Sequence, residues 1–144
     1  MSVNVGQRNV PDTPSNKMLY AVDRAAKLAA HTITICANPK IFLPEYQHIT
    51  QEIVNTSVEI YKDAWTANNI VVKIPDDWIT RRRMQLLAIS KCNALLALIG
   101  LAKMLYHLRS KKVKCWATMT IETRGLLRKW HEADRKRYGD LLKQ

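Results

Sequence analysis

The sequence predicts an all-α fold, an antiparallel up-down-up-down four-helix bundle, from three observations. Helix-forming residues dominate the 144 residues, and only four Gly and five Pro are present, which argues against a turn-rich all-β chain. Apolar residues recur at steps of three and four through four segments, the spacing of one helix face. The connectors between these segments are short, as they are between antiparallel neighbours in a bundle. A chain of this length suits one domain with its own core.

Residues 1–12 are expected to form a flexible polar tail, and residues 13–144 the bundle. Thr13 and Pro14 favour the start of the first helix, because Thr is a good N-cap and Pro suits the first helical position. The pair Asn38-Pro39 favours its end. The predicted inner face of this helix comprises Met18, Val22, Ala25, Ala26, Ala29, Ile33 and Cys36.

The second helix is predicted to open at Pro44-Glu45 and to end at Asn68-Asn69. Two apolar stripes about 100° apart give it a wide apolar arc that can touch two neighbours. The stripes are Tyr46, Ile49, Ile53, Ile60 and Ala64, and Val54, Val58, Tyr61 and Trp65. Residues 70–74 are mostly β-branched and have strand propensity. A lone strand has no pairing partner, however, so we expect an extended loop packed on the bundle.

The third helix is predicted to begin at Pro75-Asp76-Asp77, whose carboxylates suit the N-terminal dipole, and to end near Ser110. Residues 81–108 are apolar nearly all round, which is typical of a helix in the middle of a bundle or at a subunit interface. We do not expect a membrane span. The longest uninterrupted apolar run, residues 94–102, is far shorter than the roughly 20 residues that a bilayer requires.

The fourth helix is predicted to follow a basic connector, residues 111–117, with Thr118 or Thr120 as its N-cap. Its predicted inner face comprises Met119, Thr123, Leu126, Trp130 and Ala133. The basic stripe consists of Arg124, Arg128, His131 and Arg135. It spans about 60°, roughly opposite the inner face. Antiparallel packing should also bring residues 81–83 near residues 135–137.

Positive charge is concentrated in the last part of the chain. The net charge is +11, and residues 103–144 hold 12 Lys and Arg against 4 Asp and Glu, whereas residues 1–102 hold 11 against 8. Such asymmetry indicates a polyanion partner. We expect nucleic acid in preference to an acidic protein surface or no polyanion at all. The residues predicted to contact phosphates are Arg81, Arg82, Arg83, Lys111, Lys112, Lys114, Arg124, Arg128, Lys129, Arg135, Lys136 and Arg137.

The sequence offers little catalytic or metal-binding chemistry. Its four His show no HxxxH or HExxH spacing and no Cys at metal-ligand spacing. The chain also has no Gly-rich phosphate loop and no nucleophile elbow. We therefore expect no enzyme activity, no cofactor and no metal. Three Cys without a CxxC pair indicate reduced thiols and a cytoplasmic location.

The four Trp have two possible roles, core packing and stacking on an unpaired base. Trp65 and Trp130 lie on predicted apolar faces, and we expect both in the core. Trp78 and Trp116 lie beside basic clusters at helix ends, where base stacking is a stronger alternative. We expect that these two also cover the core.

The layout of the chain resembles a known family. The segments that show the resemblance are residues 18–36, 68–77, 83–89, 94–99, 119–122 and 128–130. A basic chain of this size, with a broken second helix, a very apolar third helix and an Arg-rich fourth, is similar to the accessory variability determinants of diversity-generating retroelements. These belong to a wider four-helix group that includes proteins encoded in intervening sequences of 23S ribosomal RNA genes.

The resemblance implies a homo-pentameric barrel with a basic surface and no active site. It also implies two partners, a reverse transcriptase and its template RNA or an RNA/DNA hybrid, which together make mutagenised cDNA. Two alternatives stay open. One is a ribosomal-RNA-associated four-helix protein without a reverse transcriptase. The other is a protein-interaction adaptor whose basic face meets an acidic partner.

Overall fold

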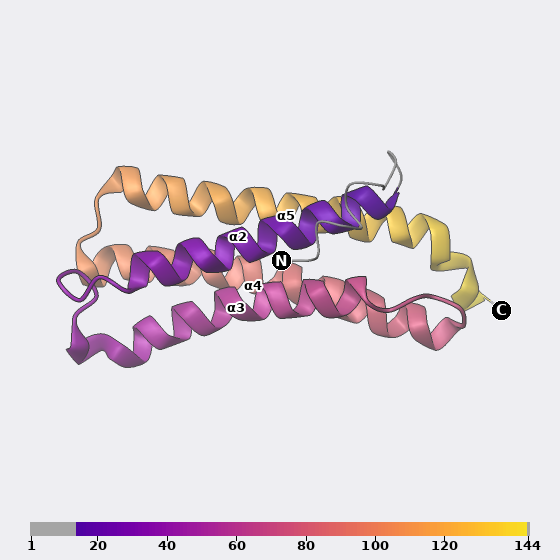
Figure 1. The fold of residues 1–144 in the computed structure, drawn as a ribbon, viewed down its shortest axis with the longest axis horizontal. Helices are drawn as coiled ribbons and strands as arrows, with labels where there is room; N and C mark the ends of the chain where they lie inside the picture. The colour runs from indigo at the N-terminus through magenta and orange to yellow at the C-terminus, as the bar shows by residue number, and fades with distance from the viewer. Residues whose placement is uncertain (1–13, 144) are drawn as a thin grey trace, which may run out of the picture.

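Residues 14–143 are described by a computed structural model, and they are helical throughout apart from short connectors. Four long helices lie lengthwise beside one another, with their loops at the two ends of the molecule (Figure 1). They are α2 (Pro14–Cys36), α3 (Gln47–Asn68), α4 (Pro75–Tyr106) and α5 (Ser110–Tyr138), with 3-10 helices η1 (Pro44–Tyr46) and η2 (Gly139–Lys143). The predicted tail and the predicted cap Thr13 lie outside the described residues.

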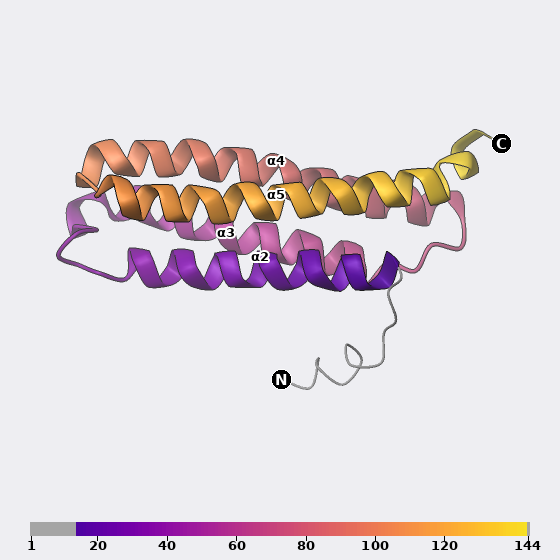
Figure 2. The same cartoon turned by 90° about the horizontal axis from the view of Figure 1, so that it is seen from above.

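The four helices form a bundle in which each helix has two neighbours. Helix α4 packs on α3 and α5, and α2 packs on the same two helices from the other side (Figure 2). The all-helical four-helix architecture is therefore confirmed. No strand occurs between residues 14 and 143, and residues 70–74 form a loop, as predicted. Two side chains of that loop, Val71 and Ile74, are exposed instead of packed on the bundle.

The core is a continuous apolar cluster along the axis of the bundle. All four helices contribute fully buried side chains, among them Leu28, Ile53, Ile60, Leu95, Ile99 and Leu127. Burying each such side chain stabilises the fold by about 1.5–3 kcal/mol. The predicted core positions Trp78, Trp116 and Trp130 are confirmed, since each is at most 1% exposed.

The boundary between the third and fourth helices differs from the prediction. Helix α4 ends at Tyr106, because His107 adopts a left-handed conformation (φ 52°, ψ 46°) that ends a helix. Helix α5 begins at Ser110, so residues 111–117 are its first two turns and neither Thr118 nor Thr120 is its cap. Trp116 explains this early start, since its buried indole N–H donates to Thr32 Oγ1 at 3.0 Å and fixes these turns against α2.

Two predicted inner-face positions are wrong, and the predicted inner face of α5 is displaced. Ile33 is 46% exposed and Trp65 is 42% exposed, although both were expected in the core. On α5, the buried side is set by Trp116, Thr120, Thr123, Leu127, Trp130 and Asp134, while Met119, Leu126 and Ala133 are only half-buried. The inner face of α5 was misplaced because a search for regularly spaced apolar residues cannot detect buried polar residues. Thr120, for example, is fully buried because its hydroxyl donates to the Trp116 carbonyl at 3.0 Å.

A buried ion pair joins the start of α4 to the end of α5. Arg81 Nε lies 2.8 Å from Asp134 Oδ2, and the two side chains are 5% and 0% exposed. Gln85 Nε2 also donates to Asp134 Oδ2 at 2.7 Å. Arg81 Nη1 donates to the carbonyl of Ile70 at 2.8 Å, which anchors the loop between α3 and α4. These contacts confirm that residues 81–83 lie near residues 135–137.

Replacing Arg81 by Met should lower the free energy of unfolding by about 3–5 kcal/mol, because it removes the nearer and buried cation of Asp134 and leaves only Arg137, whose Nη1 lies 3.7 Å from Oδ1. Urea denaturation followed by circular dichroism measures this. The matched control is Arg83→Met on the exposed side of the same helix turn, which should change stability by about 0.5 kcal/mol or less. Equal stability of the Arg81→Met variant and the parent chain would contradict a structural role for the pair.

Candidate nucleic-acid interface

Helix α5 holds most of the predicted phosphate contacts, and its acidic residues are already engaged. It contains nine Lys and Arg against three carboxylates. Each carboxylate forms an ion pair with an arginine: Glu122 with Arg24, Glu132 with Arg135, and Asp134 with Arg81. None of the three is therefore left to neutralise the lysines of the helix.

Five of the remaining cations form a row along the outer side of α5, which we call the α5 row: Lys111, Lys114, Arg128, Lys129 and Lys136. All five are exposed, and none lies within 4.0 Å of a carboxylate in the described part of the chain. They fall within about 100° of arc and extend over about 38 Å, given 1.5 Å per residue and 3.6 residues per turn. This length is about one helical turn of a B-form duplex, so the row can meet the backbone at more than one point along it.

The prediction that Arg81 contacts phosphate is wrong. This side chain is 4% exposed, paired with Asp134, and its guanidinium lies 5.5 Å from the centroid of the Trp130 ring. A phosphate cannot reach it without breaking the core. Its neighbours Arg82 and Arg83 remain accessible, with Arg82 half-buried over Trp78 at 5.9 Å and Arg83 exposed. Successive residues on a helix point about 100° apart, so the three arginines cannot share one face, and here Arg81 lies on the buried side.

Two cations near the end of α5 are engaged with carboxylates. The Arg135 Nε donates to Glu132 Oε2 at 3.0 Å, and this hydrogen bond lowers the pKa of Glu132. The Nη1 atom of Arg137 lies 3.7 Å from Asp134 Oδ1. The Glu132 pair is exposed and so contributes little to stability, which leaves Arg135 able to exchange its partner for a phosphate.

The basic stripe lies at the seam between α5 and α4, not opposite the core. Arg124 Nη1 donates to Asn93 Oδ1 at 2.7 Å, and His131 Nδ1 lies 3.0 Å from Gln85 Oε1. The predicted orientation was wrong because the true buried side of α5 is rotated away from Met119 and Leu126. Arg124 and His131 are therefore half-buried, and Arg128 and Arg135 are the exposed members of the stripe.

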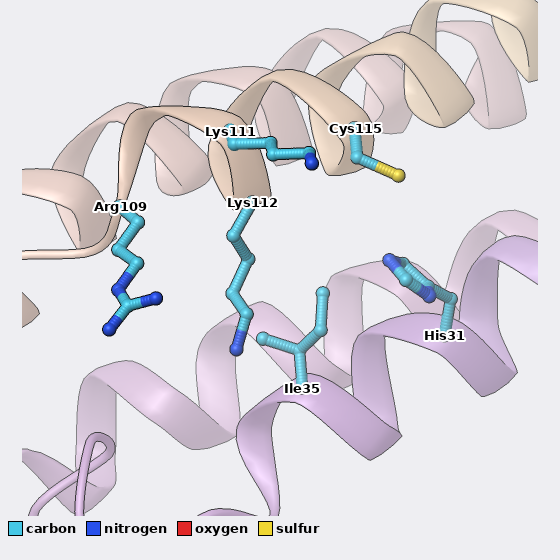
Figure 3. Close-up of a pocket in the computed structure, with 6 residues that line it drawn as sticks. All are labelled: His31, Ile35, Arg109, Lys111, Lys112 and Cys115. Carbon is cyan, nitrogen blue, oxygen red and sulfur yellow. The ribbon is translucent and has the colours of Figure 1, made fainter.

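Sequence reasoning missed Arg109 as a possible anion contact. Arg109 precedes α5 and lies with Lys111 and Lys112 around a hollow of about 360 Å³ between α5 and α2 (Figure 3). The available signal was its place in the run Arg109-Ser110-Lys111-Lys112. The prediction that the third helix ends near Ser110 placed Arg109 inside that helix and apart from the basic residues that follow.

The remaining chemistry of the described residues is sparse. Among residues 14–143 no group of three His, Cys, Asp or Glu side chains is placed to hold a metal ion. No protein-family model, curated protein or solved structure matches the chain. The functional interpretation therefore depends on the geometry of the basic surface and on the resemblance described above.

His131 should make the fold sensitive to acid. Burial lowers its pKa below the usual 6.5, so on acidification the unfolded chain takes up this proton before the folded chain does. Unfolding free energy should thus fall as the pH drops below about 6.5. Denaturation between about pH 7 and 5.5 should show a shallower pH slope for His131→Asn and an unchanged slope for His48→Asn, on the exposed side of α3. Identical slopes in both variants would contradict the assignment.

Proposed function

We propose that this chain is a non-catalytic RNA-binding accessory protein. In this proposal it binds a reverse transcriptase and its template RNA and supports mutagenic cDNA synthesis in a diversity-generating retroelement. The observation that supports RNA binding is the α5 row, whose lysines and arginine have no acidic partner among residues 14–143. The reverse transcriptase and the retroelement rest on the resemblance to the accessory variability determinants.

The α5 row favours contact with the sugar-phosphate backbone over recognition of base sequence. Lysine and arginine neutralise phosphates and release counterions, which gives affinity that falls steeply with salt. Base reading by stacking needs accessible aromatic rings. Trp78, Trp116 and Trp130 are buried in the core, and the exposed Trp65 lies on α3 instead. We therefore expect RNA binding with little sequence preference.

Reversing two charges of the α5 row, Lys129→Glu and Lys136→Glu, should weaken RNA binding by at least about tenfold and lower the slope of log K against log salt by about two. Both residues are exposed, so circular dichroism should show an intact fold. The matched control is Lys62→Glu with Lys73→Glu, which changes the net charge equally on α3 and the following loop. Fluorescence anisotropy with labelled RNA measures both pairs. If both pairs lose the same affinity for RNA, only the total charge matters and the α5 row is not the binding surface. If the parent chain does not bind RNA, the protein-interaction adaptor is favoured instead.

We further propose that this up-down-up-down bundle assembles with copies of itself through the outer side of α4. Helix α4 is long and apolar enough to cross a membrane by length and composition, yet only 28% of its most apolar stretch is buried inside the bundle. Leu86, Leu87 and Met104 are 46%, 38% and 70% exposed, and Ala94 and Ala97 lie exposed between them. Apolar surface of this extent is typical of an interface.

The charge on α4 supports a second copy of the chain as the occupant of that side. Lys91, the lysine near the middle of α4, turns toward α3, where its Nζ lies 2.7 Å from Asp63 Oδ2. The outer side is therefore uncharged over its middle turns, which lets two basic chains meet without repulsion there. A closed ring forms when this side of one copy contacts a different side of the next copy, because contact between the same side of two copies gives a two-fold dimer. The resemblance implies that the ring has five members.

The paired change Leu86→Glu and Met104→Glu should reduce the oligomer to monomers, because it places carboxylates in the uncharged contact. Light scattering measures the mass in solution. The control pair, Ile33→Glu and Val71→Glu, has almost the same exposure, 46% and 69%, and should leave the mass unchanged. A monomeric parent chain would overturn the proposal, and a chain soluble only in detergent would favour a membrane as the occupant.

A further inference from the structure

The hollow between α2 and α5 has a cationic side, formed by the start of α5, and a side without permanent charge, formed by α2. Its lining residues are His31, Ile35, Arg109, Lys111, Lys112 and Cys115. In Figure 3, Arg109 and Lys112 extend from the start of α5 toward α2, where Ile35 and His31 face them. A volume of about 360 Å³ is in the range of small-ligand sites.

The positive charge of the hollow is not neutralised within the described chain. Arg109, Lys111 and Lys112 form no ion pair with a carboxylate of residues 14–143. The local sequence explains this, because residues 78–121 contain no Asp or Glu. Three cations therefore face a partly apolar space with no internal counter-charge.

These cations also lie at the unfavourable end of a helix. The N-terminus of α5 carries the positive pole of the helix dipole, where cations are destabilising and anions are stabilising. The first turn of α5 has no acidic residue, and its N-cap Arg109 makes no side-chain capping hydrogen bond. An anion in the hollow would offset the positive pole of the helix dipole. It would also accept hydrogen bonds from the uncapped backbone N–H groups, since such groups at a helix N-terminus bind anions well.

We propose that this hollow binds the terminal phosphate monoester of a nucleotide, either at the phosphorylated end of an RNA strand or on a free mononucleotide. A terminal phosphate carries nearly two negative charges at neutral pH, which suits three clustered cations better than the single charge of an internal phosphodiester. The hollow is larger than a phosphate, and the attached nucleoside would lie against its α2 side, which His31 and the edge of Ile35 line. The strand-end source rests on the proposed RNA-binding function, whereas the free nucleotide does not.

Cys115 supplies a natural reporter at this site. It lies exposed on the lining, whereas Cys36 and Cys92 are buried. Burial raises the pKa of each of these two thiols to about 12, so both react slowly with alkylating reagents. The rate of Cys115 alkylation, followed by mass spectrometry of the whole chain, therefore reports whether the hollow is occupied.

The test compares hexanucleotide RNAs phosphorylated at the 5′ or the 3′ end, the unphosphorylated hexanucleotide, adenosine monophosphate, adenosine and inorganic phosphate. At a concentration ten times its dissociation constant, a ligand leaves about a tenth of the protein free. A phosphorylated RNA or adenosine monophosphate should therefore slow Cys115 alkylation by about tenfold. Equal protection by unphosphorylated RNA or by inorganic phosphate, or no protection by any nucleotide, would overturn the proposal.

Lys112→Gln removes one cation of the hollow and should abolish the advantage of phosphorylated over unphosphorylated RNA. The matched control is Lys114→Gln, in the same turns of α5 but outside the lining. Lys114→Gln should weaken the binding of both RNAs equally and leave the ratio of their affinities unchanged. A preserved phosphate preference in Lys112→Gln would overturn the assignment.

A second readout is His31, whose pKa lies below its usual value because of burial and the nearby charge of Lys112. A bound phosphate dianion should raise that pKa in an NMR titration, and a decrease or no change on nucleotide binding would contradict the site.

The RNA-binding proposal and the proposal for the hollow can fail independently of each other. Protection by adenosine monophosphate with no binding of longer RNA would leave this inference standing without the RNA-binding function. If the α5 row binds RNA but phosphorylated RNA protects Cys115 no better than unphosphorylated RNA, the RNA-binding function would stand and the proposed phosphate site would not.

Discussion

The buried pair of Arg81 and Asp134 is the contact on which one end of the bundle depends. It fixes the start of α4 against the end of α5 and, through the Ile70 carbonyl, holds the connecting loop. The same carboxylate positions Gln85, whose amide oxygen then faces His131. Because Gln85 donates through its nitrogen to Asp134, its oxygen is the acceptor and His131 Nδ1 carries the proton. A single buried charge thus orients the ring of a neighbour two contacts away and selects which of its nitrogens donates.

That arrangement also explains how a chain with net charge +11 keeps a stable, apolar interior. Most of the carboxylates near the helix contacts are used internally, as in the pair of Lys91 with Asp63 and the pair of Arg24 with Glu122. The lysines of the α5 row and of the first turn of α5 form no such pair, and neither do some exposed lysines elsewhere, such as Lys62 and Lys73. Positive charge without an acidic partner among residues 14–143 is nevertheless most concentrated on α5.

Much of the fold could be predicted from the sequence, because apolar periodicity with few Gly and Pro specifies long helices directly. The first and second helices end where Asn38-Pro39 and Asn68-Asn69 predicted. The errors arose where a polar or charged residue is buried. Arg81, Asp134 and Thr120 look like surface residues until their partners are known, and those partners are distant in sequence. The start of α5 was misplaced for a related reason, since local charge argues against a helix there and the contact of Trp116 with Thr32 overrides it.

The contact between Trp116 and Thr32 joins residues 84 positions apart, and that of Arg24 with Glu122 joins residues 98 apart. Helices α4 and α5, by contrast, are separated by a three-residue turn at His107. Closing a long loop loses more chain entropy than closing a short one, and non-local contacts slow folding. We therefore expect α4 and α5 to associate early and α2 to dock on α5 late. The hollow they enclose would then be among the last features to form as the chain folds and among the first to open when it fluctuates.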